Sequence, residues 1–157
     1  MILLVHMLFG AAIGYKIYSV TNNVWLALFL AFWGHYFLDL FPHVEYSVNN
    51  IKNKLWKKSL SDFSKIFLDF FFGFFVIFLF SNRQLGGQFI IYLCALTAVI
   101  PDGLTFINYI FPNSVLNFPD KIHGGKIHYL TKNKKFPLSW RISTQTATII
   151  ISIILLK

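Results

Sequence analysis

The sequence is short of charge. Charged residues make up only 13% of the 157 positions, whereas a soluble domain carries about 25%. Acids are the scarcest, with six against 14 lysines and arginines, so the net charge is +8. Hydrophobic residues reach 56%, aromatic residues 19%, and the mean hydropathy is +0.61. This composition excludes an ordinary soluble domain and predicts an integral membrane protein.

Several chemical features are absent as well. The single cysteine, Cys94, excludes an internal disulfide. No Ser-His-Asp or Cys-His arrangement occurs at a recognisable spacing, and no glycine-rich phosphate loop follows a strand pattern. The N-terminus has no basic stretch, and its apolar run contains His6 and Lys16, so we expect no secretory signal.

Apolar runs divide the chain into five candidate membrane helices. A helix needs about 20 residues to cross the hydrocarbon core. The last run is short and begins with polar residues, so its helix either starts nearer Pro137 or is partly buried against the others. We therefore predict an all-α, polytopic membrane bundle of about five transmembrane helices, forming a single domain over residues 1–157. The runs are approximately Met1–Val20, Val24–Phe41, Phe63–Phe80, Gln88–Phe111 and Ile142–Leu156.

Basic residues predict the orientation. Eleven of the 14 lie in residues 52–65 and 121–141, while the other three are Lys16, Arg83 and Lys157. Five crossings place these two sets on opposite faces, and the richer face is expected in the cytoplasm. The predicted location is a bacterial or archaeal cytoplasmic membrane, with the N-terminus in the cytoplasm. Anionic lipid then explains the net charge, and no nucleic-acid partner is expected.

Three of the six acids, Asp39, Asp69 and Asp102, lie inside apolar runs. A carboxylate buried in a membrane needs a proton, a cation or a histidine partner, and such residues are candidates for function. His35 and Asp39 are four residues apart, on one face of a helix, as are His6, Gly10 and Gly14. Counted along the helices, the histidines and aspartates fall in one layer near the cytoplasmic side. The alternatives are a simple His35–Asp39 hydrogen bond and protonated, structural aspartates.

Imidazole and carboxylate together suit zinc and its first-row neighbours. We expect one or two divalent ions, zinc first, with manganese or iron as alternatives. The catalytic residues proposed at this stage are Asp69 and His128. The predicted metal ligands are His6, His35, Asp39, Asp69, Asp102 and His128.

The loops around these residues lead to further expectations. His123 and His128 flank two glycines, which suggests a loop able to approach a substrate, although a basic loop binding anionic lipid is the alternative. Pro101 removes a backbone donor and is expected to break its helix beside Asp102. Pro42 is expected to end the second helix and leave His43 on a turn.

These motifs resemble those of small inner-membrane proteins known as membrane-bound metal-dependent hydrolases. The similarity covers the early histidine, Gly34-His35-x-x-x-Asp39, Pro101-Asp102 and His123-x4-His128. Gly34 stands where that family has serine. The His35 to His43 stretch is also similar to the helical zinc phospholipase C and single-strand nuclease family. The resemblance implies a metal-dependent hydrolase and favours a phosphoesterase.

The sequence therefore predicts a membrane-embedded metal-dependent hydrolase. Its expected substrate is a lipid or lipid-linked phosphoester at the cytoplasmic side, and its expected partners are membrane lipids. A proton- or ion-coupled transporter or channel that uses the same Asp/His cluster is the principal alternative. A haem-binding bundle and a structural membrane protein are the others. The sequence does not predict the oligomeric state.

Overall fold

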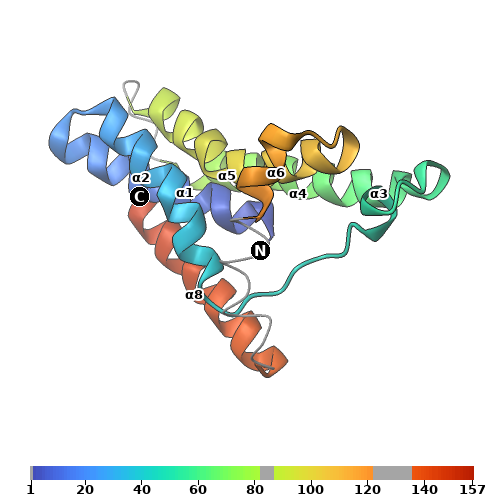
Figure 1. The fold of residues 1–157 in the computed structure, drawn as a ribbon. Helices are drawn as coiled ribbons and strands as arrows, with labels where there is room; N and C mark the ends of the chain where they lie inside the picture. Colours follow the sequence, from blue (N-terminus) through green and yellow to red (C-terminus); the bar gives the residue numbers. More distant parts are fainter. Residues whose placement is uncertain (1, 82–86, 122–135) are drawn as a thin grey trace.

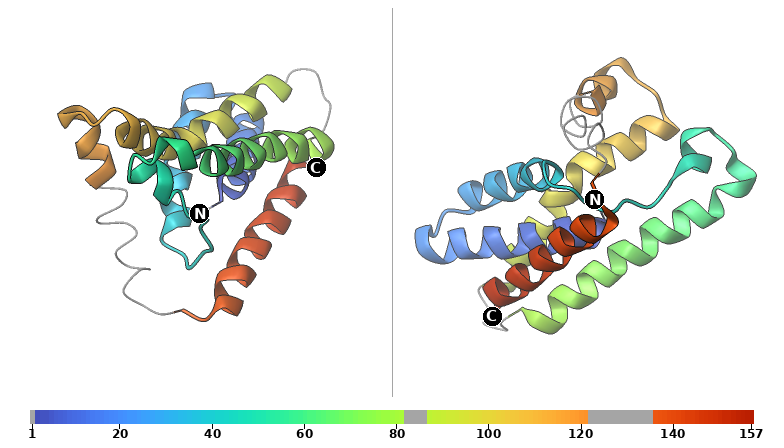
Figure 2. Two further views of the ribbon diagram at one scale, coloured as in Figure 1. Left: turned by 90° about the vertical axis from the view of Figure 1, so that its right-hand side faces the viewer. Right: turned by 90° about the horizontal axis from the view of Figure 1, so that it is seen from below.

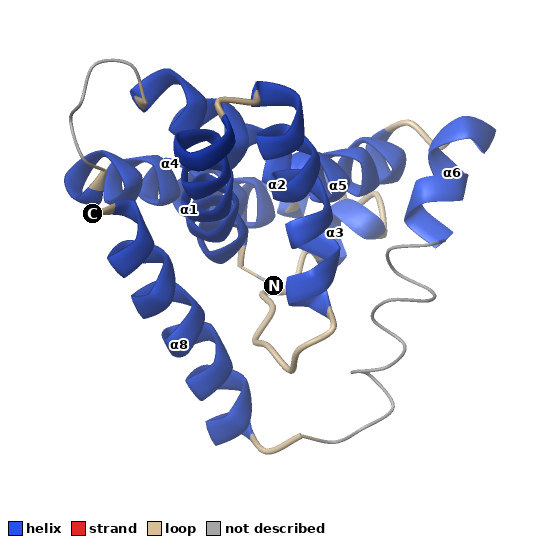
Figure 3. Cartoon of the chain, turned by 90° about the vertical axis from the view of Figure 1, so that its left-hand side faces the viewer, coloured by secondary structure: helices blue, strands red, loops and turns tan. Residues whose placement is uncertain are grey.

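A computed structural model describes residues 2–81, 87–121 and 136–157, and every regular element in these ranges is helical (Figure 3). The predicted all-α membrane bundle is confirmed. Short elements connect or follow the long helices: α3 (Asn49–Lys52), η1 (Trp56–Lys58) and α6 (Ser114–Asp120). The long helices are α1 (Leu3–Thr21), α2 (Val24–Asp39), α4 (Leu60–Phe80), α5 (Gln88–Ile110) and α8 (Leu138–Leu156).

The five predicted apolar runs correspond to these five long helices. Four of them, α1, α4, α5 and α8, are long and apolar enough to cross a membrane, while α2 is shorter at 16 residues. The helix α8 begins just after Pro137, as one of the two sequence interpretations expected. The helix α2 ends at Asp39, and His43 lies outside regular structure.

The helix α1 lies at the centre of the bundle. It contacts α2, α4, α5 and α8 (Figures 1 and 2). Small residues allow this close packing: a Cβ added at Gly10 would overlap Ala98, and one added at Gly14 would overlap Cys94, both on α5. Small residues spaced by four let membrane helices approach closely. The predicted glycine face of α1 is therefore a helix–helix contact.

A tight turn makes α1 and α2 an antiparallel pair. Asn22 ends α1 in the left-handed conformation (φ 53°), which asparagine tolerates. The Asn23 side chain then accepts a hydrogen bond from the Leu26 N–H at 3.0 Å and caps α2. Because the two helices run in opposite directions, the start of α1 lies beside the end of α2. This arrangement brings His6 toward His35 and Asp39.

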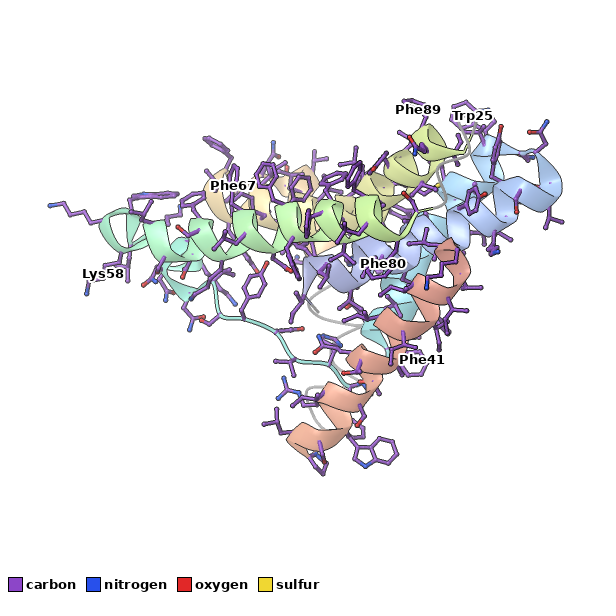
Figure 4. All side chains as sticks on the ribbon, turned by 180° about the vertical axis from the view of Figure 1, so that it is seen from behind. Trp25, Phe41, Lys58, Phe67, Phe80 and Phe89 are labelled. Atoms are coloured by element: carbon purple, nitrogen blue, oxygen red, sulfur yellow. The ribbon has the colours of Figure 1, made fainter. Side chains whose placement is uncertain are left out.

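The outer surface is apolar and aromatic. Side chains such as Phe67 on α4 and Phe89 on α5 point away from the bundle (Figure 4) and are 60% and 72% exposed. A soluble fold buries such faces, whereas a membrane helix presents them to lipid. This exterior supports an integral membrane protein.

Described members of the two predicted sets of basic residues lie at opposite ends of α4. The lysine-rich segment leads into the start of α4, with Lys58 at the tip of the molecule (Figure 4). At the other end, the Lys157 ammonium lies 5.9 Å from the centroid of the Phe80 ring. These described members are thus separated along α4, and the absolute orientation in the membrane stays a prediction.

Pro101 does not break its helix. The helix α5 runs without interruption from Gln88 to Ile110, with Pro101 buried inside it. Proline removes one N–H and one backbone hydrogen bond, but neighbouring helices can support the chain around it. The expected broken helix beside Asp102 is therefore wrong.

Candidate metal centre

His35 lies near the end of α2 and faces α5. Its Nδ1 is 2.8 Å from the carbonyl oxygen of Ala98, close enough for the ring N–H to donate a hydrogen bond. A carbonyl has two lone pairs, so Ala98 can accept this bond as well as its helical one. With the proton on Nδ1, the lone pair is on Nε2. A backbone carbonyl commonly orients a metal-binding imidazole in this way.

Asp39 lies between the two histidines. Its Oδ2 is 3.2 Å from Nε2 of His35, and its Oδ1 is 3.3 Å from Nε2 of His6. All three side chains are completely buried. The His35–Asp39 contact is the i, i+4 contact that the sequence predicts.

His6 enters the cluster from the first turns of α1. Its ring stacks on that of His35, with 3.9 Å between centroids and 24° between planes. Among the described residues Nδ1 of His6 has no hydrogen-bond partner, and Nε2 lies 3.3 Å from Oδ1 of Asp39. Leaving a buried polar atom without a partner is costly. In neutral imidazole one of the two nitrogens carries a lone pair, and that nitrogen fits a role as donor to an ion.

Asp102 completes the group from the middle of α5. Its Oδ1 is 3.7 Å from Nε2 of His35, and its side chain is 27% exposed, whereas those of His6, His35 and Asp39 are fully buried. One ligand atom from each of His6, His35 and Asp102 lies within 4.8 Å of the others. Asp102 is thus the part of the cluster that a molecule from outside can reach.

The donor set fits a divalent cation. Two imidazoles and one carboxylate, with a position left open, are a common ligand set of catalytic zinc. Asp39 touches the same two imidazoles and is the fourth candidate ligand. Such a cation would balance the two carboxylates, which lie in an interior that strongly penalises uncompensated charge.

The remaining candidate residues are Asp69 and the other histidines. Asp69 accepts hydrogen bonds from the N–H groups of Leu3 (2.6 Å) and Leu4 (3.3 Å), so it meets the start of α1 and is not in the metal-capable group. His43 is buried, with Nδ1 2.7 Å from the Phe41 carbonyl and Nε2 2.7 Å from Glu45. His123 and His128 lie outside the described residues.

Two features were missed by the sequence analysis. The side chain of Tyr46, after α2, lies close to Asp69, and no sequence pattern marks it. Asp62 precedes the apolar run that begins at Phe63, but in the structure it lies in the first turn of α4 and is 1% exposed. Asn50 and Ile51 donate backbone bonds to it, so it caps α3. An acid beside a helix start is a signal for such a cap, although its partner helix could not be identified from sequence.

Comparison of the chain with family models, with curated proteins and with solved structures gives no match.

Proposed function

We propose that this protein is a membrane-embedded, metal-dependent hydrolase that acts on a phosphoester of a lipid or lipid-linked substrate. The observation that carries the proposal is the convergence of His6, His35 and Asp102 to within 4.8 Å inside an apolar bundle. The resemblance of the motifs to membrane-bound metal-dependent hydrolases supports the same conclusion.

Each residue of the cluster has a proposed part. His6 and His35 offer ring nitrogens from two antiparallel helices, and the Ala98 carbonyl holds the His35 ring. Asp39 lies against both rings and supplies a second carboxylate. Asp102, partly exposed, faces the side from which a substrate arrives. A bound divalent ion supplies Lewis acidity for hydrolysis.

The proposed substrate follows from the surroundings of the cluster. The exterior of α4 and α5 is apolar, and an amphiphile can approach it from within the bilayer. A phosphate group is attracted both to a cation at the cluster and to the lysines that precede α4. Catalytic participation of His128 remains part of the proposal from sequence.

Removal of the metal tests the proposal. The purified protein should contain stoichiometric zinc or manganese, because the folded cluster brings the donors together. A chelator should lower the thermal midpoint in detergent and abolish phosphoester hydrolysis together, since binding to the folded state stabilises it. Zinc or manganese should restore both. Full turnover of phospholipids in nanodiscs after complete metal removal would overturn the proposal.

A proton- or ion-coupled transporter is the second candidate. The contacts of Asp39 with both His6 and His35 form a chain of titratable groups, which is also what a proton relay requires. Metal content separates the two functions. A protein that purifies without metal, binds none on titration and conducts protons in liposomes is a relay.

A further inference from the structure

Two carboxylates on α4 each accept hydrogen bonds from the first N–H groups of another helix. Asp62 accepts the N–H groups of Asn50 (2.8 Å) and Ile51 (3.3 Å) at the start of α3. Asp69 accepts those of Leu3 (2.6 Å) and Leu4 (3.3 Å) at the start of α1. Seven residues are about two helical turns, so both carboxylates lie on one face of α4.

Neither capped helix has a cap of its own. The N-cap residues are Ile2 for α1 and Val48 for α3, and neither makes a side-chain capping bond. The first N–H groups of a helix have no partner within it, and a negative charge there is favourable. Asp69 thus provides from another helix the cap that α1 lacks.

This cap sets the position of α1 along α4. One turn after Asp69, a Cβ added at Gly73 would lie 2.7 Å from the Met7 sulfur and 3.5 Å from the Leu4 Cα. The contacts of Asp69 and Gly73 therefore enclose the first two turns of α1. His6 lies between Leu4 and Met7, so its ring is held at this register.

Asp69 also meets the segment that follows α2. The side chain of Tyr46, in this segment, lies close to the Asp69 carboxylate. The same segment is fastened to α8, where Arg141 Nε donates to the His43 carbonyl at 2.7 Å and Gln145 Nε2 donates to the Val44 carbonyl at 2.9 Å. In Figure 1 this segment runs from the end of α2, beside α8, toward α3. One carboxylate thus joins α4 to the start of α1 and to the chain leaving α2.

We infer that Asp69 is a positioning residue for the candidate metal centre, which holds His6 in place through the first turn of α1 and does not itself bind the ion. This inference rests on the proposed function for its metal readout. It replaces the sequence-based expectation that Asp69 is a metal ligand and a catalytic residue.

The test compares Asp69→Asn with Asp62→Asn. The amide keeps an acceptor but loses the charge, and Asp62→Asn removes the same kind of cap away from the cluster. Cobalt is the probe for affinity. Asp69→Asn should raise the cobalt dissociation constant by about 10- to 100-fold, the range typical of groups that orient ligands. Asp62→Asn should leave it unchanged.

A second readout needs no metal. His6→Cys with His35→Cys, in a Cys94→Ala background, replaces the stacked rings with two thiols whose oxidation by diamide reports their distance. Asp69→Asn should slow this cross-linking several-fold, and Asp62→Asn should not. If the parent protein binds no cobalt, the proposed function fails, and cross-linking alone decides this inference.

Three results would overturn the inference. One is an Asp69→Asn protein that matches the parent in both measurements. Another is loss of cobalt with cross-linking at the parent rate, which would make Asp69 a ligand. The third is an equal effect of both asparagine variants. If Asp69→Asn does not fold, Asp69→Glu replaces it, because it keeps the charge but displaces the carboxylate, and full cobalt affinity would then count against the inference.

Discussion

At the scale of single residues, two buried histidines differ in the side chains that they face. His35 and His43 are both buried, at 1% and 5% exposure, and each has a ring nitrogen beside a backbone carbonyl. The Nε2 side of the His35 ring faces Asp39 and Asp102, whereas that of the His43 ring faces Glu45. Only the first arrangement gathers donors from three helices.

This difference leads to a matched pair of variants. His35→Ala removes a proposed ligand. It should weaken zinc binding by more than ~100-fold, because loss of a group that only orients a ligand typically costs ~10- to 100-fold. His43→Ala removes a buried histidine outside the cluster and should leave zinc affinity near that of the parent. Isothermal titration of the metal-free proteins measures both. Equal affinities for the two variants would place the ion elsewhere.

Tyr46 provides a pH-dependent prediction. Burial raises the pKa of its phenol, and the nearby charges of Asp69 and then Asp102 raise it further. Because the pKa is raised in the folded state, the neutral phenol's contribution to stability is fully present below the ordinary pKa of about 10. This contribution is lost as pH rises above that value toward the folded-state pKa. Thermal midpoints measured from pH 8 to 12 should fall more steeply for the parent than for Tyr46→Phe. Parallel curves would contradict this assignment.

At the scale of helices, packing of α1 against α5 depends on the absence of side chains. A Cβ at Gly10 would overlap Ala98 and lie 3.1 Å from the Cys94 carbonyl oxygen. Gly103 lies on α5, and a Cβ added there meets nothing within 4 Å among the described residues. Close helix packing therefore requires glycine at position 10 but not at position 103.

Alanine substitution at these positions should give opposite results. Gly10→Ala should destabilise the bundle by about 1–3 kcal/mol, because the added methyl group overlaps α5. Moving α1 and α5 apart to make room would loosen the histidine–aspartate cluster. Gly103→Ala should be neutral or stabilising by up to ~1 kcal/mol, since alanine is the better helix former. Thermal midpoints in detergent distinguish them. A Gly10→Ala protein as stable as the parent would show that this contact is loose.

At the scale of the whole molecule, the bundle has two chemically different ends. One carries exposed Lys54, Lys57 and Lys58 before α4. The other carries the Asn22–Asn23 turn and Lys157. Because the lysine-rich end is expected in the cytoplasm, the structure can be oriented in a membrane.

Cysteine labelling checks this orientation. In a Cys94→Ala background, Asn22→Cys should react with an impermeant maleimide added outside intact cells. Asn53→Cys, in the lysine-rich segment, should react only after the membrane is opened. The reverse pattern would invert the protein and place the cluster near the outer face.

Much of the architecture follows from the sequence. Apolar runs of suitable length locate the five long helices of the described residues. Within lipid, a single segment can form all its backbone hydrogen bonds only as a helix. The i, i+4 spacing of His35 and Asp39 is confirmed by their 3.2 Å contact, since helical geometry dictates it. Counting residues along helices also places His6 and Asp102 at a similar depth.

The tertiary structure alone decided which residues of that layer meet. Depth follows from residue number, but the direction in which each helix faces depends on how neighbouring surfaces pack. Residue counting places Asp69 in the same layer, yet its carboxylate accepts the N–H groups of Leu3 and Leu4 at the start of α1, which has no cap of its own. The Ala98 carbonyl that orients His35 carries no signal in the sequence, since every residue has one. Composition and periodicity thus determined a membrane bundle with buried histidines and aspartates, and helix packing selected His6, His35, Asp39 and Asp102 from among them.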